Sequence, residues 1–332
     1  MPHRGGLRAL VIWLHLVLPP CARAQAPALN APPALPTDSA AYGADGYRLA
    51  VLLQVRGDFP EGTGTPSSFF LRKAEVSIRA RVAPATHLSV EFDPVRSEDP
   101  FRRTYLRLSH IRWLHLKIGM EKAPLGLDEL LSSARVPFVD RSEVSDRFSA
   151  AEEVGVHLES RWARWLAQVS VTNGGRRLLR DDNDHKDVSG RLVWAPVPDV
   201  SLGVAALDGR VGAGEIERRR YNAEVRLGTG DSGVQAEYFD AKDASVRSQA
   251  FYVSAFHAFA TGVGPVSHLQ PVVRYERVDR DDEVAAEELS LLTFGGSVLL
   301  GGHRSKLQVN YVWDLRPGLS ENVLRIQYQV EF

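Results

Sequence analysis

The C-terminal stretch Leu324–Phe332 reads LRIQYQVEF and decides the fold class. Every second side chain in it is apolar, at Leu324, Ile326, Tyr328, Val330 and Phe332. The side chains between them are all polar, at Arg325, Gln327, Gln329 and Glu331. Because successive residues of a β-strand point to opposite faces of a sheet, the stretch predicts a strand with one apolar face and one polar face.

The same two-residue period recurs along the chain, for example in residues 73–82, 87–92 and 114–118. No segment sustains the apolar stripe at i, i+3, i+4 and i+7 that an amphipathic helix shows. In a soluble sandwich the polar face would meet water and the apolar face the second sheet. Alternation alone therefore leaves both a β-sandwich and a β-barrel open.

The number of strands separates these two folds. We predict sixteen, with boundaries good to about 2–4 residues, at residues 47–56, 69–82, 85–93, 101–109, 111–119, 153–160, 163–172, 187–195, 199–207, 217–227, 233–241, 246–259, 267–278, 288–300, 303–314 and 322–332. Short turns, such as Ala83–Pro84 and residues 260–266, alternate with mostly longer polar segments, such as residues 57–68 and 208–216. An even count with this alternation, and with both termini on the short-turn side, is typical of bacterial outer-membrane barrels.

The N-terminus predicts export. Arg4 and Arg8 precede an apolar run over residues 9–18, and Ala22–Ala24 matches the small-residue pattern of a signal-peptidase site. We expect residues 1–24 to be a signal peptide cleaved after Ala24. The alternative is a retained anchor, but the run has about half of the ~20 residues that a spanning helix needs. A lipoprotein signal at Cys21 is disfavoured by the preceding prolines, Pro19 and Pro20.

Residues 25–46 are rich in Ala and Pro and predict a flexible tail, so residues 47–332 remain for the barrel. Cys21 is the only cysteine, and the mature chain would hold no disulfide. Cleavage removes three of 40 Lys and Arg and none of 41 Asp and Glu, which changes the formal charge from −1 to −4. An acidic balance argues against a nucleic-acid partner. No stretch is long and apolar enough for a membrane helix, so an exported chain that stays in a membrane must do so as a barrel.

Several blocks of the chain resemble the phosphate-selective porin O and P family of Gram-negative outer-membrane proteins. The blocks are Phe70–Val76 (FLRKAEV), Tyr105–Leu108 (YLRL), Ile118–Asp128 (IGMEKAPLGLD), Phe138–Ser142 (FVDRS) and Asn173–Gly174. The terminal Phe332 resembles the signature that the outer-membrane assembly machinery reads. The resemblance implies a homotrimeric porin for passive diffusion of small hydrophilic solutes or ions, including anions such as phosphate, without a bound cofactor.

The resemblance also implies basic side chains along the pore. Our candidates for pore lining and selectivity are Lys73, Arg79, Arg81, Arg103, Arg107, Lys117, Lys122, Arg135 and Arg141. A ring of basic side chains is what an anion path needs. These residues are interleaved with Glu75, Glu91 and Asp93, so the sequence leaves anion and cation preference open.

The charged segment Glu121–Glu152 exceeds the usual length of a loop, and loops of that length tend to be functional. We expect it to fold into the barrel and narrow the pore; the alternative is a loop that lies across the outer mouth. The fold class is therefore all-β: a transmembrane antiparallel β-barrel of about 16 strands with a long inward-folding loop. Outer-membrane lipid and lipopolysaccharide are the expected surroundings.

Motifs for catalysis and metal binding are weak. Gly230–Gly233 (GDSG) has the heart of a serine-protease signature, but Gly, Asp and Ser are also ordinary turn residues. Gly212–Gly214 is too short for a nucleotide fingerprint. The acidic run Asp181–Asp187 lacks the glycine and the later glutamate of a calcium loop. We expect no catalytic, metal or cofactor site; the rival functions are an outer-membrane barrel enzyme of the phospholipase or protease kind and a secreted β-sandwich binding module.

Overall fold

The computed structural model describes residues 46–62, 64–96, 99–175, 180–228, 230–281, 288–316 and 321–332. The expected signal peptide, its cleavage site after Ala24 and the expected tail to residue 45 lie outside these ranges. The first strand begins at Tyr47. Among the described residues, no helix is long and apolar enough to cross a bilayer.

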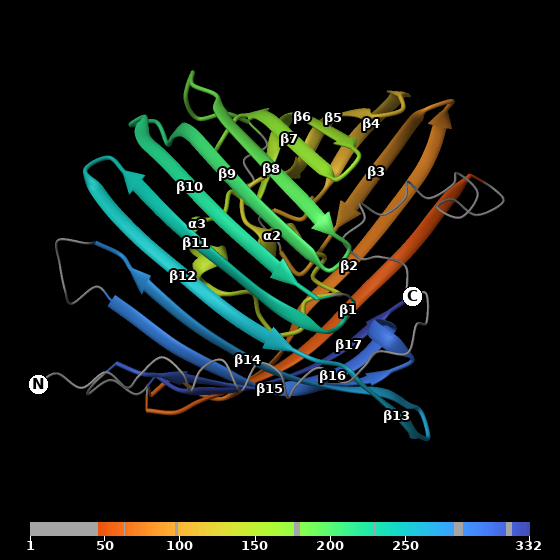
Figure 1. The fold of residues 1–332 in the computed structure, drawn as a ribbon, viewed down its shortest axis with the longest axis vertical. Helices are drawn as coiled ribbons and strands as arrows, with labels where there is room; N and C mark the ends of the chain where they lie inside the picture. The colour runs from red at the N-terminus through yellow and green to blue at the C-terminus, as the bar shows by residue number, and fades with distance from the viewer. Residues whose placement is uncertain are drawn as a thin grey trace, which may run out of the picture.

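The described residues form one antiparallel sheet that closes on itself (Figure 1). Its strands are β1 (Tyr47–Pro60), β2 (Ser68–Ala83), β3 (Thr86–Phe92), β4 (Thr104–Ile111), β5 (Leu114–Lys122), β6 (Glu152–Trp162), β7 (Trp165–Thr172), β8 (Asp187–Val197), β9 (Val200–Val211), β10 (Ile216–Leu227), β11 (Gly233–Asp243), β12 (Val246–Phe256), β13 (Phe259–Val263), β14 (Val266–Asp279), β15 (Glu288–Leu300), β16 (Ser305–Asp314) and β17 (Val323–Glu331). β12 and β13 both pair with β14 and act as one interrupted strand, so the ring has the predicted sixteen strands over the described residues.

The ring is closed by the first and last strands. β1 pairs with β17 from Leu52 opposite Glu331 to Pro60 opposite Val323. The backbone N–H of Phe332 also donates to the carbonyl of Val51 at 3.0 Å. Closure leaves no open sheet edge, which a spanning sheet requires because the hydrocarbon offers no hydrogen-bond partners. This confirms the barrel and excludes the sandwich.

The two faces of the sheet follow the alternation in the sequence. In β17, Gln327 and Gln329 are 1% and 0% exposed and point into the barrel, whereas Tyr328 is 43% exposed on the outside. The outer face is apolar and carries a row of aromatic side chains across β10 to β16: Tyr221, Tyr238, Phe251, Tyr275, Phe294 and Tyr311. At the short-turn end, Trp165 stacks on Trp194 with ring centroids 5.9 Å apart. Aromatic girdles of this kind mark the two membrane interfaces.

Two of the connections that differ from the sequence prediction lie at opposite ends of the barrel. The turn between β13 and β14 is confined to Gly264–Pro265, because β13 continues to Val263 and β14 starts at Val266. At the opposite end of the barrel, β9 continues to Val211 and β10 starts at Ile216. The expected loop over residues 208–216 is therefore shortened to residues 212–215. Propensity could not show these extensions, since they come from pairing with a neighbouring strand.

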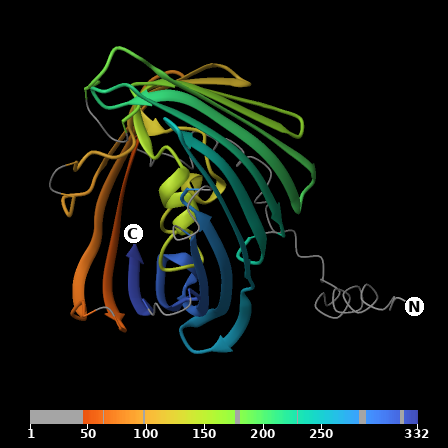
Figure 2. The same ribbon diagram turned by 90° about the vertical axis from the view of Figure 1, so that its left-hand side faces the viewer.

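The segment between β5 and β6 enters the barrel (Figure 2). We call residues 123–151 the inner loop. It contains two short helices, α2 (Leu127–Leu130) and α3 (Glu143–Phe148), and Ser142 caps α3 by accepting from the N–H of Ser145 at 2.9 Å. Phe148 stacks on Phe239 of β11 with centroids 6.0 Å apart, inside an apolar cluster. The structure thus confirms the inward-folding loop.

Candidate functional site

The inner loop is hydrogen-bonded to one side of the lumen. Glu237 of β11, 2% exposed, accepts from the backbone N–H groups of Leu127 at 2.6 Å and Asp128 at 3.0 Å. The hydroxyl of Tyr252 on β12 donates to the same carboxylate at 2.7 Å. Because two N–H groups at the start of α2 share one acceptor, the position of this helix is fixed against β11.

Further along, wall side chains bind the backbone of the loop. Lys306 Nζ of β16 donates to the carbonyl of Val136 at 2.9 Å, and Gln308 Nε2 donates to that of Pro137 at 3.0 Å. The N–H of Val139 donates to Asn310 Oδ1 at 2.7 Å. These polar wall residues are 1% exposed, so the loop covers them completely.

Asp140 makes the strongest link between loop and wall. Its carboxylate lies 2.8 Å from Arg56 of β1, 3.0 Å from Arg72 of β2 and 2.9 Å from Arg325 of β17. Burial by itself would raise the pKa of Asp140, but the charges of Arg325, Arg72 and Arg56 outweigh burial and hold it at about 2. Asp140 is therefore ionised at neutral pH and ties the loop to three strands.

Two of the predicted selectivity residues stabilise the inner loop itself. Lys122 Nζ donates to the carbonyls of Glu129 and, at 3.2 Å, Leu131. Arg141 donates to the carbonyls of Asp128 at 2.9 Å and Leu131 at 2.6 Å. Both also lie 3.3 Å from the carboxylate of Glu129. These two cationic side chains cap the C-terminal end of α2, where backbone carbonyls lack hydrogen-bond partners within the helix.

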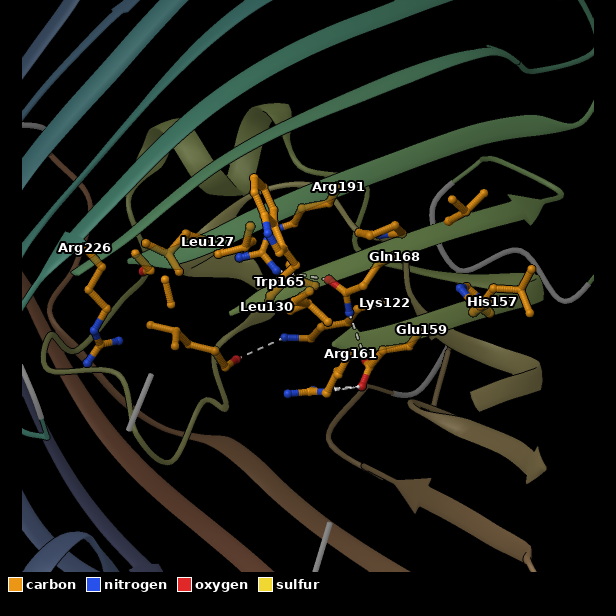
Figure 3. Close-up of a pocket in the computed structure, with 18 of the residues that line it drawn as sticks. Lys122, Leu127, Leu130, His157, Glu159, Arg161, Trp165, Gln168, Arg191 and Arg226 are labelled. Carbon is orange, nitrogen blue, oxygen red and sulfur yellow. Dashed lines mark hydrogen bonds and ion pairs between the residues drawn. The ribbon is translucent and has the colours of Figure 1, made fainter. Parts of the chain in front are cut away.

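The inner loop does not fill the other side of the lumen, which we call the open half. A cavity of about 610 Å³ lies between the inner loop and the inner face of β5 to β10 (Figure 3). It reaches from the loop down to the short turns at Ala163–Arg164 and Pro198. Its charged lining is mostly basic, with two acids, Glu121 and Glu159, against seven cations: Arg103, Lys117, Lys122, Arg161, Arg164, Arg191 and Arg226.

Some of these cations are neutralised by a carboxylate. Lys117 lies 2.6 Å from Glu121, Arg161 lies 2.7 Å from Glu159, and Arg191 is paired with Glu224. Arg226 donates instead to the carbonyl of Gly230 at 3.1 Å, and Arg164 to the carbonyl of Pro196. Within the described part of the chain, Arg164 and Arg226 form no ion pair with a carboxylate, although the charge of Asp231 acts on Arg226 from a longer distance.

A row of basic side chains leads into this cavity around the inside of the wall. Cross-strand neighbours from β2 to β6 are, in order, Arg81, His87, Arg107, Lys117 and His157. Arg79 lies on β2, two residues before Arg81, directly opposite Arg48 of the neighbouring strand β1. Arg48 and Arg79 line a smaller cleft of about 100 Å³ together with Arg103 and the carboxylates of Glu75, Glu91 and Glu331.

The remaining predicted residues lie at the boundary between wall and loop. Lys73 Nζ is 2.6 Å from Glu75 and 3.1 Å from Ser133 of the loop, and Arg103 is 2.6 Å from Glu91. Arg135 is exposed on the loop. Eight of the nine predicted residues therefore belong to the basic row, to the supports of the loop, or to the lining of the cavity and the smaller cleft; Arg135 belongs to none of these groups.

Sequence reasoning missed the cations of β6 to β10 and those that bind Asp140. Arg191 lies on the polar face of β8 together with Ser189, and Arg226 lies on the polar face of β10 together with Glu224. The two-residue alternation of each strand could therefore have identified both arginines. Arg72 could not be found in this way, since strict alternation turns it away from Lys73. A bulge opposite Gln54 and Val55 brings both side chains into the lumen.

The structure gives no support to the protease-like motif. His303 Nε2 lies 2.6 Å from Asp231 Oδ1, but the hydroxyl of Ser232 accepts from the N–H of Ala258 and so stabilises the turn. No group of three His, Cys, Asp or Glu that could hold a metal ion occurs among the described residues.

Comparison with known proteins agrees with this geometry. The family model "Phosphate-selective porin O and P" matches residues 61–210. This part of the chain matches the porin family, and the match indicates an outer-membrane channel rather than an enzyme. The matched segment contains the basic row and the whole inner loop, which connects β5 to β6.

Solved porins share the fold at low sequence identity. OmpF of Salmonella typhi, in complex with daunomycin, superposes with a TM-score of 0.64 at 10% identity, over 87% of this chain and 98% of that one. An anion-selective porin from Comamonas acidovorans gives 0.60 at 13%, over 86% and 99%. OmpT of Vibrio cholerae in its trimer form gives 0.60 at 10%, over 86% and 99%. A search of the curated proteins found no match.

Proposed function

We propose that this porin conducts small anions, phosphate among them, through the open half of its lumen. The observation that carries the proposal is the pair Arg164 and Arg226, which line the cavity without a carboxylate partner in the described chain. Passing solutes meet these charges at close range in a narrow, partly desolvated path.

The basic row supports the same direction of preference. Arg81, Arg107 and Lys117 offer successive donors around the wall, and guanidinium groups match the geometry of phosphate oxygens. Of the sequence candidates, we assign selectivity to Arg79, Arg81 and Arg107. Arg103 and Lys117 also line the cavity, but each is paired with a carboxylate. We assign Lys73, Lys122 and Arg141 to support of the loop, and Arg135 to a minor electrostatic role.

The proposal extends to the surroundings of the barrel. We infer export with cleavage after Ala24, assembly through the terminal Phe332, contact with lipid and lipopolysaccharide, and a homotrimer. Support comes from the aromatic girdles of the outer face, from the exposed side chain of Phe332, and from the trimer form described for the Vibrio cholerae neighbour.

The test is single-channel current through the purified porin in a planar bilayer with a salt gradient. We expect stepwise conductance and a reversal potential on the anion side. Added phosphate should reduce the chloride current by competing for the same arginines. A reversal potential on the cation side would contradict the proposal, and so would correctly folded barrels without conductance.

A further inference from the structure

One wall of the cavity in the open half of the lumen is apolar, and the passage of inorganic ions does not require an apolar wall. On the loop side it is lined by Pro124, Leu127, Leu130 and Leu131. Leu127 and Leu130 are labelled in Figure 3. Leu130 and Leu131 are half-buried and keep part of their aliphatic surface toward the cavity, whereas Leu127 is 8% exposed. An apolar wall in an ion path holds water poorly, so it opposes bare hydrated ions.

The facing wall combines cations with further apolar groups. Arg161 of β6 and Arg191 of β8 stand on the same inner face as Leu166, Val193 and Ala195. Gln168 lies between the charges, donates to Glu159 at 3.0 Å and accepts from Arg191 at 3.0 Å. A solute in the cavity can therefore reach a guanidinium on one side while an aliphatic or aromatic part contacts leucines on the other.

From these two walls we infer that the cavity binds organic anions with an apolar body, such as medium-chain or aromatic carboxylates. The carboxylate would replace water at Arg226 and Arg164, which have no carboxylate partner in the described chain. The hydrocarbon part would bury surface against Leu130 and Leu131. Sites for small molecules commonly show this combination of apolar lining and a few placed charges. The inference rests on the proposed anion preference and names a substrate class for it.

The experiment compares straight-chain carboxylates of increasing length with the purified full-length porin in a planar bilayer. Acetate, butyrate and hexanoate are added to one side of a chloride solution, and the half-blocking concentration of each is measured. Burial of one methylene against an apolar wall tightens binding, so we expect the half-blocking concentration to fall by about threefold per added methylene. Equal block by acetate and hexanoate in an anion-selective channel would overturn this inference and leave the proposed function intact.

Variants at Leu130 assign the effect to the loop wall. Leu130→Asn should remove most of the dependence on chain length, whereas Leu130→Met, which stays apolar at similar volume, should retain it. A steady current without fluctuations between conductance levels in both variants shows that the inner loop is intact. Full chain-length dependence in Leu130→Asn would place the apolar contact elsewhere and contradict the assignment. A cation-selective wild-type channel would overturn this inference together with the proposed function.

Discussion

The two halves of the lumen use the same kinds of side chain for different purposes. On the wall formed by β11 to β17 and by the parts of β1 and β2 near Asp140, inward polar groups are buried under the inner loop, and Arg56, Arg72 and Arg325 surround Asp140. On the wall formed by β5 to β10, arginines face a cavity. An arginine that points into the lumen therefore does not indicate a solute path until its ion-pair partner is known. These two walls bound the covered half and the open half of the lumen.

Removing the loop should abolish the difference between the halves. Deletion of residues 126–146 takes away the segment that fills the covered half, and we expect unitary conductance to rise by about twofold or more because the pore area increases. The groups it uncovers, such as Glu237 and Arg325, would be hydrated by lumen water. Deletion of the outer-loop residues 181–184 provides the control. Unchanged conductance in the first variant would contradict a constriction by the inner loop.

Asp140→Asn should loosen the loop without removing it. The pKa of Asp140 is lowered to about 2, so the ionised carboxylate contributes about 2 kcal/mol that the neutral amide cannot. We expect current fluctuations between two conductance levels where the wild-type channel is steady.

The same carboxylate predicts a pH profile. A lowered pKa means that the stabilisation is complete above the usual carboxyl pKa, near ~3.9, and is lost as pH falls through about 2. Wild-type current should therefore be steady between pH 7 and 4. Fluctuations that begin near pH 5 would show that another group holds the loop.

Equal charge changes in the two halves should have unequal effects. Arg226→Gln removes a cation without a carboxylate partner in the described chain, so the anion-to-cation permeability ratio should fall by about twofold. Arg325→Gln removes a cation that is bound to Asp140, with Arg56 and Arg72 still in place, and should leave the ratio unchanged. Reversal potentials in a potassium chloride gradient measure both. A larger shift from Arg325→Gln would reverse the assignment of the halves.

The smallest effect is expected for Arg135→Gln. The pKa of Asp231 is lowered by its hydrogen bond with His303 and also by the charge of Arg135, so Arg135 is partly compensated. We expect a shift in reversal potential below that of Arg226→Gln, in the same direction. A shift larger than that of Arg226→Gln would make Arg135 a principal selectivity residue.

The strand pattern could be predicted because it depends on one local rule. Alternation in segments such as Leu324–Phe332 follows from lipid on one side and a polar lumen on the other, and it fixed the number of strands. The inner loop was predictable from its length and charge. Its partners were not: Asp140 and Arg325 lie far apart in the chain, and nothing local to either residue reports on the other.

The candidate site was predicted only in part for the same reason. Lys117 and Arg107 were found because parity places them inside. Strand alternation does not predict that Arg141 donates a hydrogen bond to the carbonyl of Leu131, or that a bulge brings Arg72 into the lumen. The distinction between a pore charge and a structural charge depends on tertiary contacts.

Chemical accessibility tests the two halves most directly. With Cys21→Ser as background, Gln168→Cys places a thiol in the open half, and Gln308→Cys places one under the loop, where the native side chain is 1% exposed. An anionic methanethiosulfonate added during recording should modify Gln168→Cys quickly, with a stepwise loss of current, and Gln308→Cys slower by about a hundredfold or more, since reaction there needs local opening of the loop. Equal rates at the two positions would contradict the division of the lumen into an open and a covered half.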